Sequence, residues 1–181
     1  MHSHLDSILI HETTILSRLD ELGRQLTHDF TGKDLTVLLI LHGSIFFAAD
    51  LVRRINLPLQ LTSLSVASYH GSPASSGTVT FHQSDLPDVR GRHVLIVDDI
   101  LDTGLTLATV RRRIDDECHP ASTRLCVLLQ KRRPRPVNVQ PDYVGFHIDN
   151  EFVVGYGLDS QGHYRNLPLI GTLKQEFIVP G

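Results

Sequence analysis

The stretch VLIVDDILDTGLT, residues 94–106, decides the fold of this 181-residue chain. Its first four residues form an unbroken apolar run, which predicts a buried strand of a parallel sheet. Asp98 and Asp99 end that run, and Asp102 follows in a turn. The residues from Thr106 to Arg113 favour a helix with a hydroxyl group at its start. The sequence therefore predicts a strand, a polar turn and a helix in direct succession.

The polar turn is suited to binding a phosphorylated sugar. A helix N-terminus presents free backbone N–H groups and a positive dipole end to a phosphate. Carboxylates at the same strand end suit magnesium or sugar hydroxyls. Alternatively, Asp98, Asp99 and Asp102 are ordinary turn and cap residues. Their crowding at the carboxyl end of an apolar strand, where open α/β sheets bind ligands, favours a site.

The composition excludes several classes of protein. A chain of 181 residues that is 41% hydrophobic can form one good core but not two comfortable domains. Its net charge of −3 argues against a general nucleic-acid or membrane-surface binder. The N-terminus does not resemble a signal peptide, and no apolar run approaches the length of a membrane span. Two cysteines without C-x-x-C spacing predict reduced thiols in a cytoplasmic protein.

The remaining periodicity predicts a single α/β domain of residues 1–181. A helical pattern covers about residues 11–29, and a second strand–turn–helix unit follows at 37–55. Further strands are expected at 59–69, 78–81, 125–129, 143–148 and 152–156. We expect a mostly parallel central sheet with helices on both faces. A small hood lobe is expected to form from the N-terminal segment and about residues 143–181.

The residues VLIVDDILDTGLTL resemble the phosphoribosyl-diphosphate signature of the type I phosphoribosyltransferases. Four other segments resemble the hypoxanthine-guanine branch of that family, and they occur in the family's order. These are LLILHGSIFFAADL, VASYHGSPASSGTV, LLQKRRP and YVGFHIDNEFVVGYGLDSQGHYRNLPLIGTL. Together they extend from the N-terminal helix nearly to the end of the chain. The resemblance implies a type I phosphoribosyltransferase fold.

The same resemblance implies a reaction. A 6-oxopurine base would join 5-phosphoribosyl 1-diphosphate, giving diphosphate and a nucleoside monophosphate such as IMP or GMP in purine salvage. Three needs follow: a clamp on diphosphate, an acceptor for the purine proton, and exclusion of water. The implied cofactor is Mg²⁺. We expect neither nucleic acid nor a membrane as a partner. Family members are usually dimers or tetramers, so a homodimer or homotetramer is expected.

The resemblance assigns the sugar phosphate to the acidic strand end and the turn. The 5′-phosphate would be wrapped by Asp102, Thr103, Gly104, Leu105 and Thr106. Asp98 and Asp99 would face magnesium and the ribose hydroxyls. The family often has Glu at the first of these two positions, so Asp98 is a shorter carboxylate.

Four residues are assigned to the purine by the resemblance. Asp102 would be the proton partner of N7, and Lys131 would point its ammonium at O6, which favours 6-oxopurines. Phe152 would stack on the ring, and Val153 would offer backbone groups to the base edge. The alternatives are a capping aspartate, a solvated lysine and two core strand residues.

The basic cluster around Lys131 contains three further cations. The resemblance gives a role to Lys131 alone, which leaves Arg132, Arg133 and Arg135 as surface or subunit-interface residues. We take these arginines as lying outside the site.

The diphosphate is assigned to the loop at residues 41–44 and to Arg165. His42 and Gly43 would contribute backbone N–H groups, although His42 stands where relatives commonly carry Lys. The peptide before this position can be cis in the family, so a cis Leu41–His42 bond is expected. Asp159 would help to hold a second magnesium ion.

A long loop is expected to close over the reaction centre. The resemblance places the Ser68–Tyr69 pair at the start of this lid, which extends to Gly77. The alternative is a plain hairpin tip.

Two other functions remain open from the sequence. One is an RNA-binding regulator that keeps this fold, although such proteins carry Arg in place of Leu105 and need a basic face. The other is a transferase that prefers xanthine, because a few contacts to the purine C2 substituent decide among these bases.

Overall fold

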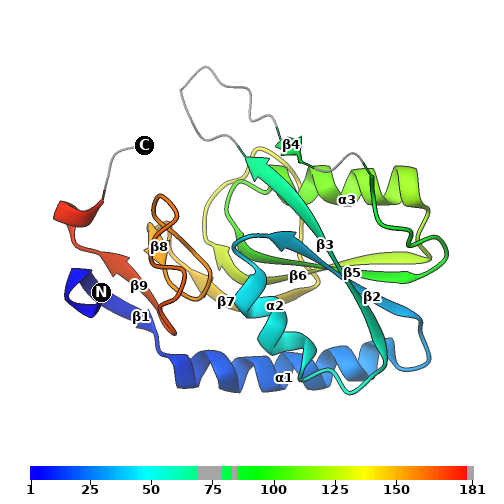
Figure 1. The fold of residues 1–181 in the computed structure, drawn as a ribbon, viewed down its shortest axis with the longest axis horizontal. Coiled ribbons are helices and arrows are strands. Elements are labelled where there is room, and N and C mark those ends of the chain that lie inside the picture. Colours follow the sequence, from blue (N-terminus) through cyan, green and yellow to red (C-terminus); the bar gives the residue numbers. More distant parts are fainter. Residues whose placement is uncertain (69–78, 83–84, 179–181) are drawn as a thin grey trace.

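A six-stranded sheet in the order β4-β3-β2-β5-β6-β7 forms the centre of the computed structural model, which describes residues 1–68, 79–82 and 85–178 (Figure 1). The strands are β2 (Leu35–Leu41), β3 (Leu59–Ser68), β4 (Val79–Phe81), β5 (His93–Leu101), β6 (Ser122–Lys131) and β7 (Tyr143–Ile148). All neighbouring pairs are parallel except β3 and β4. The expected mostly parallel sheet is therefore confirmed.

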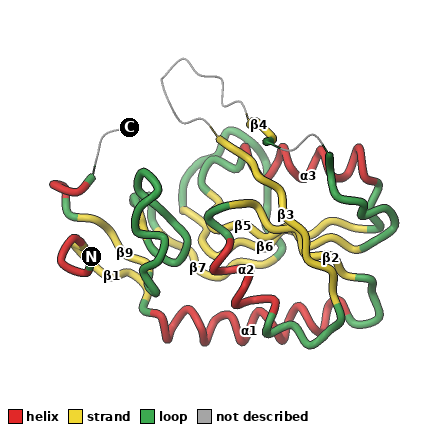
Figure 2. Tube along the Cα trace, viewed as in Figure 1, coloured by secondary structure: helices red, strands yellow, loops and turns green. Residues whose placement is uncertain are grey.

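Helices cover both faces of this sheet, as expected. Helices α1 (Glu12–Phe30) and α2 (Ile45–Val52) lie on one side, and α3 (Leu105–Cys118) lies on the other (Figure 2). The strands supply both cores by alternation: Leu95 and Val97 of β5 pack with α1 and α2, whereas Val94 and Ile96 pack with α3. A strand buried on both faces must be apolar at every position, which explains the unbroken run at the start of β5.

A second sheet joins the two ends of the chain. Strands β1 (Leu5–Ile10), β9 (Ile170–Leu173) and β8 (Val153–Val154) pair antiparallel in the order β1-β9-β8. Short 3₁₀ helices flank it at His2–His4 and Gln175–Phe177. Leu5, Val154 and Leu173 belong to a separate small core, so this sheet has its own apolar packing.

Two predicted elements differ from the structure in length. The strand expected at 152–156 is only two residues long, because Gly155 and Gly157 adopt φ of +99° and +103° and turn the chain. The helix expected at 45–55 ends at Val52. The expected hairpin is confirmed where it is described, since Val66 pairs with Phe81. Residues 143–148 lie in the main sheet as β7.

None of the described helices combines the length and apolar character needed to cross a membrane.

Replacing Leu95 by Ala should lower the free energy of unfolding by about 2–5 kcal/mol, because its buried side chain would leave a cavity between β5 and the helices. The matched control is Leu61→Ala in β3, whose side chain is 54% exposed. Urea unfolding monitored by circular dichroism measures both. Equal losses for the two variants would contradict this account of the core.

Candidate active site

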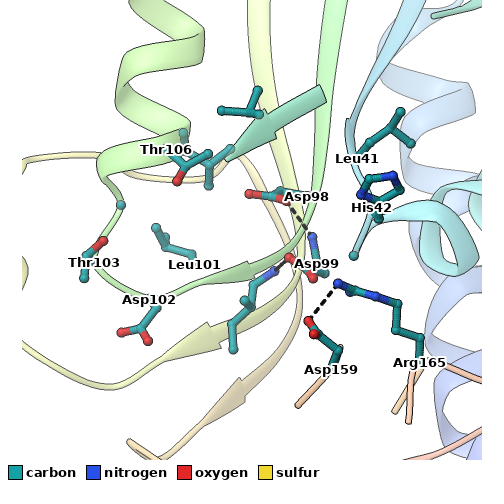
Figure 3. Close-up of a pocket in the computed structure, with 15 residues that line it drawn as sticks. Leu41, His42, Asp98, Asp99, Leu101, Asp102, Thr103, Thr106, Asp159 and Arg165 are labelled. Atoms are coloured by element: carbon teal, nitrogen blue, oxygen red, sulfur yellow. Dashed lines mark hydrogen bonds and ion pairs between the residues drawn. The ribbon is translucent and has the colours of Figure 1, made fainter. Parts of the chain in front are cut away.

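A cavity of about 440 Å³ opens at the carboxyl ends of β2 and β5 (Figure 3). Asp98 and Asp99 lie between Thr103 and Thr106 on one side and the side chains of His42 and Arg165 on the other (Figure 3). Of the residues predicted to form the site, those that line the cavity are His42, Gly43, Asp98, Asp99, Asp102, Thr103, Gly104, Thr106, Asp159 and Arg165.

Asp98 and Asp99 form a buried pair of carboxylates. Burial raises the pKa of Asp98 well above its usual value, and the adjacent charge of Asp99 adds to this shift. Burial also raises the pKa of Asp99, while hydrogen bonds at Asp98 and Ile100 and the charge of Arg165 oppose the shift. The Asp99 N–H donates to Asp98 Oδ1 at 3.0 Å, and the Ile100 N–H donates to Asp99 Oδ1 at 2.7 Å. These hydrogen bonds fix the two carboxylates in place, and the nearby positive charge does not offset the effect of their burial.

This donor set fits a magnesium ion. Magnesium prefers oxygen ligands and is commonly held by one or two carboxylates, with substrate phosphates and waters completing the octahedron. Within residues 1–68, 79–82 and 85–178, no group of three metal-binding side chains occurs. Asp98 and Asp99 are therefore suited to share an ion with a bound substrate.

Gly43 is packed directly against this pair. A Cβ atom at residue 43 would lie 1.7 Å from Asp99 Oδ2, so any larger residue would displace the carboxylate. On the other side, a Cβ at Gly157 would lie 1.9 Å from the Gly43 carbonyl oxygen. The 41–44 loop is thus held between the strand end and the loop that follows β8.

The expected cis peptide bond between Leu41 and His42 is present. The next residue but one, Ser44, is buried and donates its hydroxyl to the Ile40 carbonyl at 2.5 Å. This bond anchors the loop to the end of β2. The His42 side chain lies in the cavity (Figure 3).

Arg165 and Asp159 enter the cavity as an ion pair. Arg165 Nη2 lies 2.8 Å from Asp159 Oδ1, and Arg165 Nη1 donates to the Gly157 carbonyl at 2.6 Å. Asp159 Oδ2 accepts the Gly162 N–H at 2.6 Å. Both carboxylate oxygens of Asp159 therefore have partners within the protein.

The turn after β5 is built around Gly104. This residue has φ of +82° and a Cβ there would meet Val139 Cγ1 at 2.5 Å, so both conformation and space require glycine. Gly104 is also the N-cap of α3, which begins at Leu105. The expected hydroxyl at the helix start is present, because Thr106 is the second residue of α3, but its side chain makes no capping hydrogen bond. Its side chain lines the cavity.

Asp102 lies at the centre of a basic cluster. Lys131 Nζ lies 2.9 Å from Asp102 Oδ2, and Arg133 Nη1 lies 2.8 Å from Asp102 Oδ1. Arg135 donates to the Asp102 carbonyl at 3.1 Å and to the Lys131 carbonyl at 2.5 Å. Partial burial tends to raise the pKa of Asp102, but hydrogen bonds and charges of Lys131 and Arg133 outweigh it and lower that pKa.

This cluster corrects the interpretation of the arginines. Arg133 and Arg135 bind Asp102 rather than standing apart from the site, whereas Arg132 is largely exposed and pairs with Asp149, at 3.4 Å. A run of basic residues after a strand does not say which of them turn inwards. The placement depends on the path of the chain after β6.

Of the four residues expected at the purine, Asp102 lines the cavity, whereas Lys131, Phe152 and Val153 are not part of its lining. Lys131 ends β6 opposite Ile148 of β7, and Phe152 follows shortly after that strand with 49% of its surface exposed. Val153 is buried in β8. Leu105 is absent from the lining. The Ser68 backbone ends β3, but its side chain, Tyr69 and the expected lid lie outside the described residues.

The sequence and the fold match a known class of protein. The family model of the phosphoribosyl transferase domain matches residues 5–161. A hypoxanthine-guanine phosphoribosyltransferase of Streptococcus pneumoniae is 43% identical over 97% of both chains, and one from Mycobacterium tuberculosis is 42% identical over 93% of this chain and 86% of its own. The crystal structure of a hypoxanthine phosphoribosyltransferase from Staphylococcus aureus has a TM-score of 0.93 at 40% identity and covers 99% of this chain and 97% of its own.

The chain belongs to the phosphoribosyltransferase family, within its hypoxanthine-guanine branch. It is therefore an enzyme, a glycosyltransferase.

Replacing Gly43 by Ala should weaken binding of magnesium phosphoribosyl diphosphate by about tenfold or more, because the new methyl group occupies the place of the Asp99 carboxylate. Isothermal calorimetry measures this affinity. The control is Gly91→Ala, which has no atom within 4 Å of the added Cβ and is strained only by its φ of +70°. Gly91→Ala should cost stability while leaving the affinity unchanged, and the opposite pattern would contradict the packing argument.

Proposed function

We propose that this enzyme joins hypoxanthine, and also guanine, to 5-phosphoribosyl 1-diphosphate, releasing diphosphate and giving IMP or GMP. The observation that carries the proposal is the cavity that combines the buried Asp98–Asp99 pair with the Gly104 turn, beside the Lys131–Asp102 pair. Curated relatives of nearly the same length bear this activity in their names.

The sugar phosphate is proposed to lie across the cavity. The 5′-phosphate is bound by the turn at residues 102–106, where the α3 N-terminus presents its free N–H groups. Asp98 and Asp99 face the ribose hydroxyls. The 41–44 loop and Arg165 bind the leaving diphosphate, Arg165 through its charge and the loop through backbone N–H groups. As the diphosphate leaves, positive charge develops at ribose C1. In this arrangement the carboxylates of Asp98 and Asp99 flank that charge.

The purine is proposed to bind at Lys131 and Asp102. A 6-oxopurine presents an acceptor at O6 and a donor at N7 side by side. Lys131 and Asp102 offer a donor and an acceptor 2.9 Å apart, so their polarity complements that edge. Asp102 takes the N7 proton as the glycosidic bond forms. Its lowered pKa keeps the carboxylate ionised and makes the proton transfer late.

Phe152 is exposed next to this end of the sheet and is proposed to stack on the base, with Val153 contributing backbone groups. The lid that begins at Ser68 and Tyr69 is proposed to exclude water during the reaction.

Magnesium is the proposed cofactor, held by Asp98 and Asp99. When bound, it neutralises charge on the diphosphate and the two carboxylates. The raised pKa values of these carboxylates fit a pair that awaits a cation. A second ion at Asp159 would require that residue to give up Arg165 or Gly162.

The wider organisation is also a proposal. We place residues 1–181 in one domain whose hood is the sheet β1-β9-β8 and the adjacent loops. A homodimer or homotetramer is proposed, with the exposed Ile45 and Phe46 of α2 in the interface. The two free cysteines support a cytoplasmic location. An RNA-binding role is not favoured, since the full-length relatives are named as enzymes.

The test is diphosphate release in the presence of magnesium and phosphoribosyl diphosphate with five bases: hypoxanthine, guanine, xanthine, adenine and uracil. Turnover is expected with hypoxanthine and guanine, and removal of magnesium by EDTA should abolish it. A clear preference for xanthine would correct the substrate. The salvage function would be refuted if uracil were the only base that supports turnover, or if none of the five bases did.

Asp102→Asn should lower kcat by about 10²–10⁴-fold, the usual contribution of a general base, because the amide cannot accept the N7 proton. Binding of IMP should change little, since the product carries no proton at N7. Steady-state kinetics and IMP titration by fluorescence quenching measure the two effects. An unchanged kcat would remove Asp102 from the proton transfer.

A further inference from the structure

The two oxygens of the Asp102 carboxylate are bound by different cations. Lys131 holds Oδ2 at 2.9 Å and Arg133 holds Oδ1 at 2.8 Å. Lys131 is nearly buried, with 11% of its side chain exposed, whereas Asp102 and Arg133 are each 35% exposed. The carboxylate therefore has a buried side toward Lys131 and a more open side toward Arg133.

The backbones on either side of this carboxylate are fixed independently of it. Arg135 donates to the carbonyls of both Asp102 and Lys131, and thereby ties the turn after β5 to the end of β6. With the backbones held, the remaining freedom of Asp102 is rotation of its own side chain. Terminal carboxylate torsions have broad minima, so an outside partner is needed to define their orientation.

A bound purine changes the partners of only one oxygen. In the proposed function, Lys131 turns its ammonium toward O6 and Asp102 Oδ2 accepts from N7. Oδ1 keeps its bond to Arg133 throughout. Without that bond the carboxylate, one-third exposed, would be free to rotate its lone pairs away from the base.

We propose that Arg133 is a positioning residue: it holds Asp102 by Oδ1 and so directs Oδ2 at the purine N7 while Lys131 engages O6. This inference rests on the proposed function and extends it to a residue outside the cavity lining. Arg133 does not touch the substrate. It acts through Asp102.

The charge of Arg133 has a second effect with a defined sign. Among the described residues, the charged groups that act on Asp102 are Lys131 and Arg133, with Arg135 bound at its carbonyl. Burial tends to raise the pKa of Asp102, but Lys131 and Arg133 outweigh that effect and lower it. Because the ionised form is the active one, activity is present above this pKa and is lost as the pH falls through it. Removing Arg133 should move that loss to higher pH.

The experiment compares Arg133→Met, which removes the charge and the donors but keeps an unbranched apolar stem, with Arg132→Met. Arg132 is the matched control, since it neighbours Arg133 but is 65% exposed and pairs with the exposed Asp149 rather than with Asp102. Arg133→Met should lower kcat by about three- to tenfold, the effect of losing one partly exposed charge-assisted hydrogen bond. The KM for phosphoribosyl diphosphate should change less than kcat. The acidic limb of the kcat/KM profile should move to higher pH.

Arg133→Lys separates charge from geometry. It restores a cation, so the acidic limb should return toward the wild-type position, while kcat recovers only in part because a single ammonium lacks the planar fork of Arg. Arg132→Met should match wild type throughout. If Arg133→Met matches Arg132→Met, or lowers kcat without moving the acidic limb, the positioning role is refuted.

A measurement without turnover keeps this inference separate from the proposed function. The side-chain carboxyl ¹³C signal of Asp102 should titrate at higher pH in Arg133→Met than in wild type and Arg132→Met. An unmoved titration overturns the positioning role even if the enzyme is active. Wild-type protein that turns over no base overturns the proposed function, while this titration still decides whether Arg133 controls Asp102.

Discussion

Two adjacent carboxylates buried at the end of β5 are the constraint on which the site depends. Burial raises the pKa of both Asp98 and Asp99, so the folded chain carries an electrostatic cost that a cation relieves. The neighbouring loop has no room for a side chain at Gly43, and the loop after β8 closes on Gly43 in turn. The site is thus assembled by close backbone packing around a concentration of negative charge.

The two sheets contribute different parts of this site. The six-stranded sheet fixes the acidic pair and the turn at residues 102–106 through cores that cover both of its faces. The smaller sheet, which unites the two ends of the chain, carries the loops that bring Asp159 and Arg165 over the same cavity. Tyr156 extends this link, since its hydroxyl donates to Asp50 of α2 at 2.5 Å. The positive charge of Arg165 and the buried carboxylates of Asp98 and Asp99 therefore come from different layers.

Asp102 belongs to an opposite electrostatic environment only three residues from Asp99. Lys131 and Arg133 lower its pKa, so within five residues of the chain two carboxylates have a raised pKa and one has a lowered pKa. Separating the pKa values of neighbouring acids is how a site assigns them different roles. Here the separation comes from burial on one side of the turn and from cations at the end of β6 on the other.

The sequence by itself determined the parallel sheet, the turn after β5 and most of the site, because a fully buried strand needs an unbroken apolar run and a tight turn needs Gly104. It also determined, through resemblance, the cis bond at Leu41–His42. Only the tertiary structure decided that Arg133 and Arg135 face Asp102 while Arg132 faces solvent. It alone decided that Gly157 packs on Gly43. Local sequence patterns encode the hydrophobic periodicity of a helix or strand and the residues at which it ends. Contacts between distant segments depend instead on how the layers pack against each other.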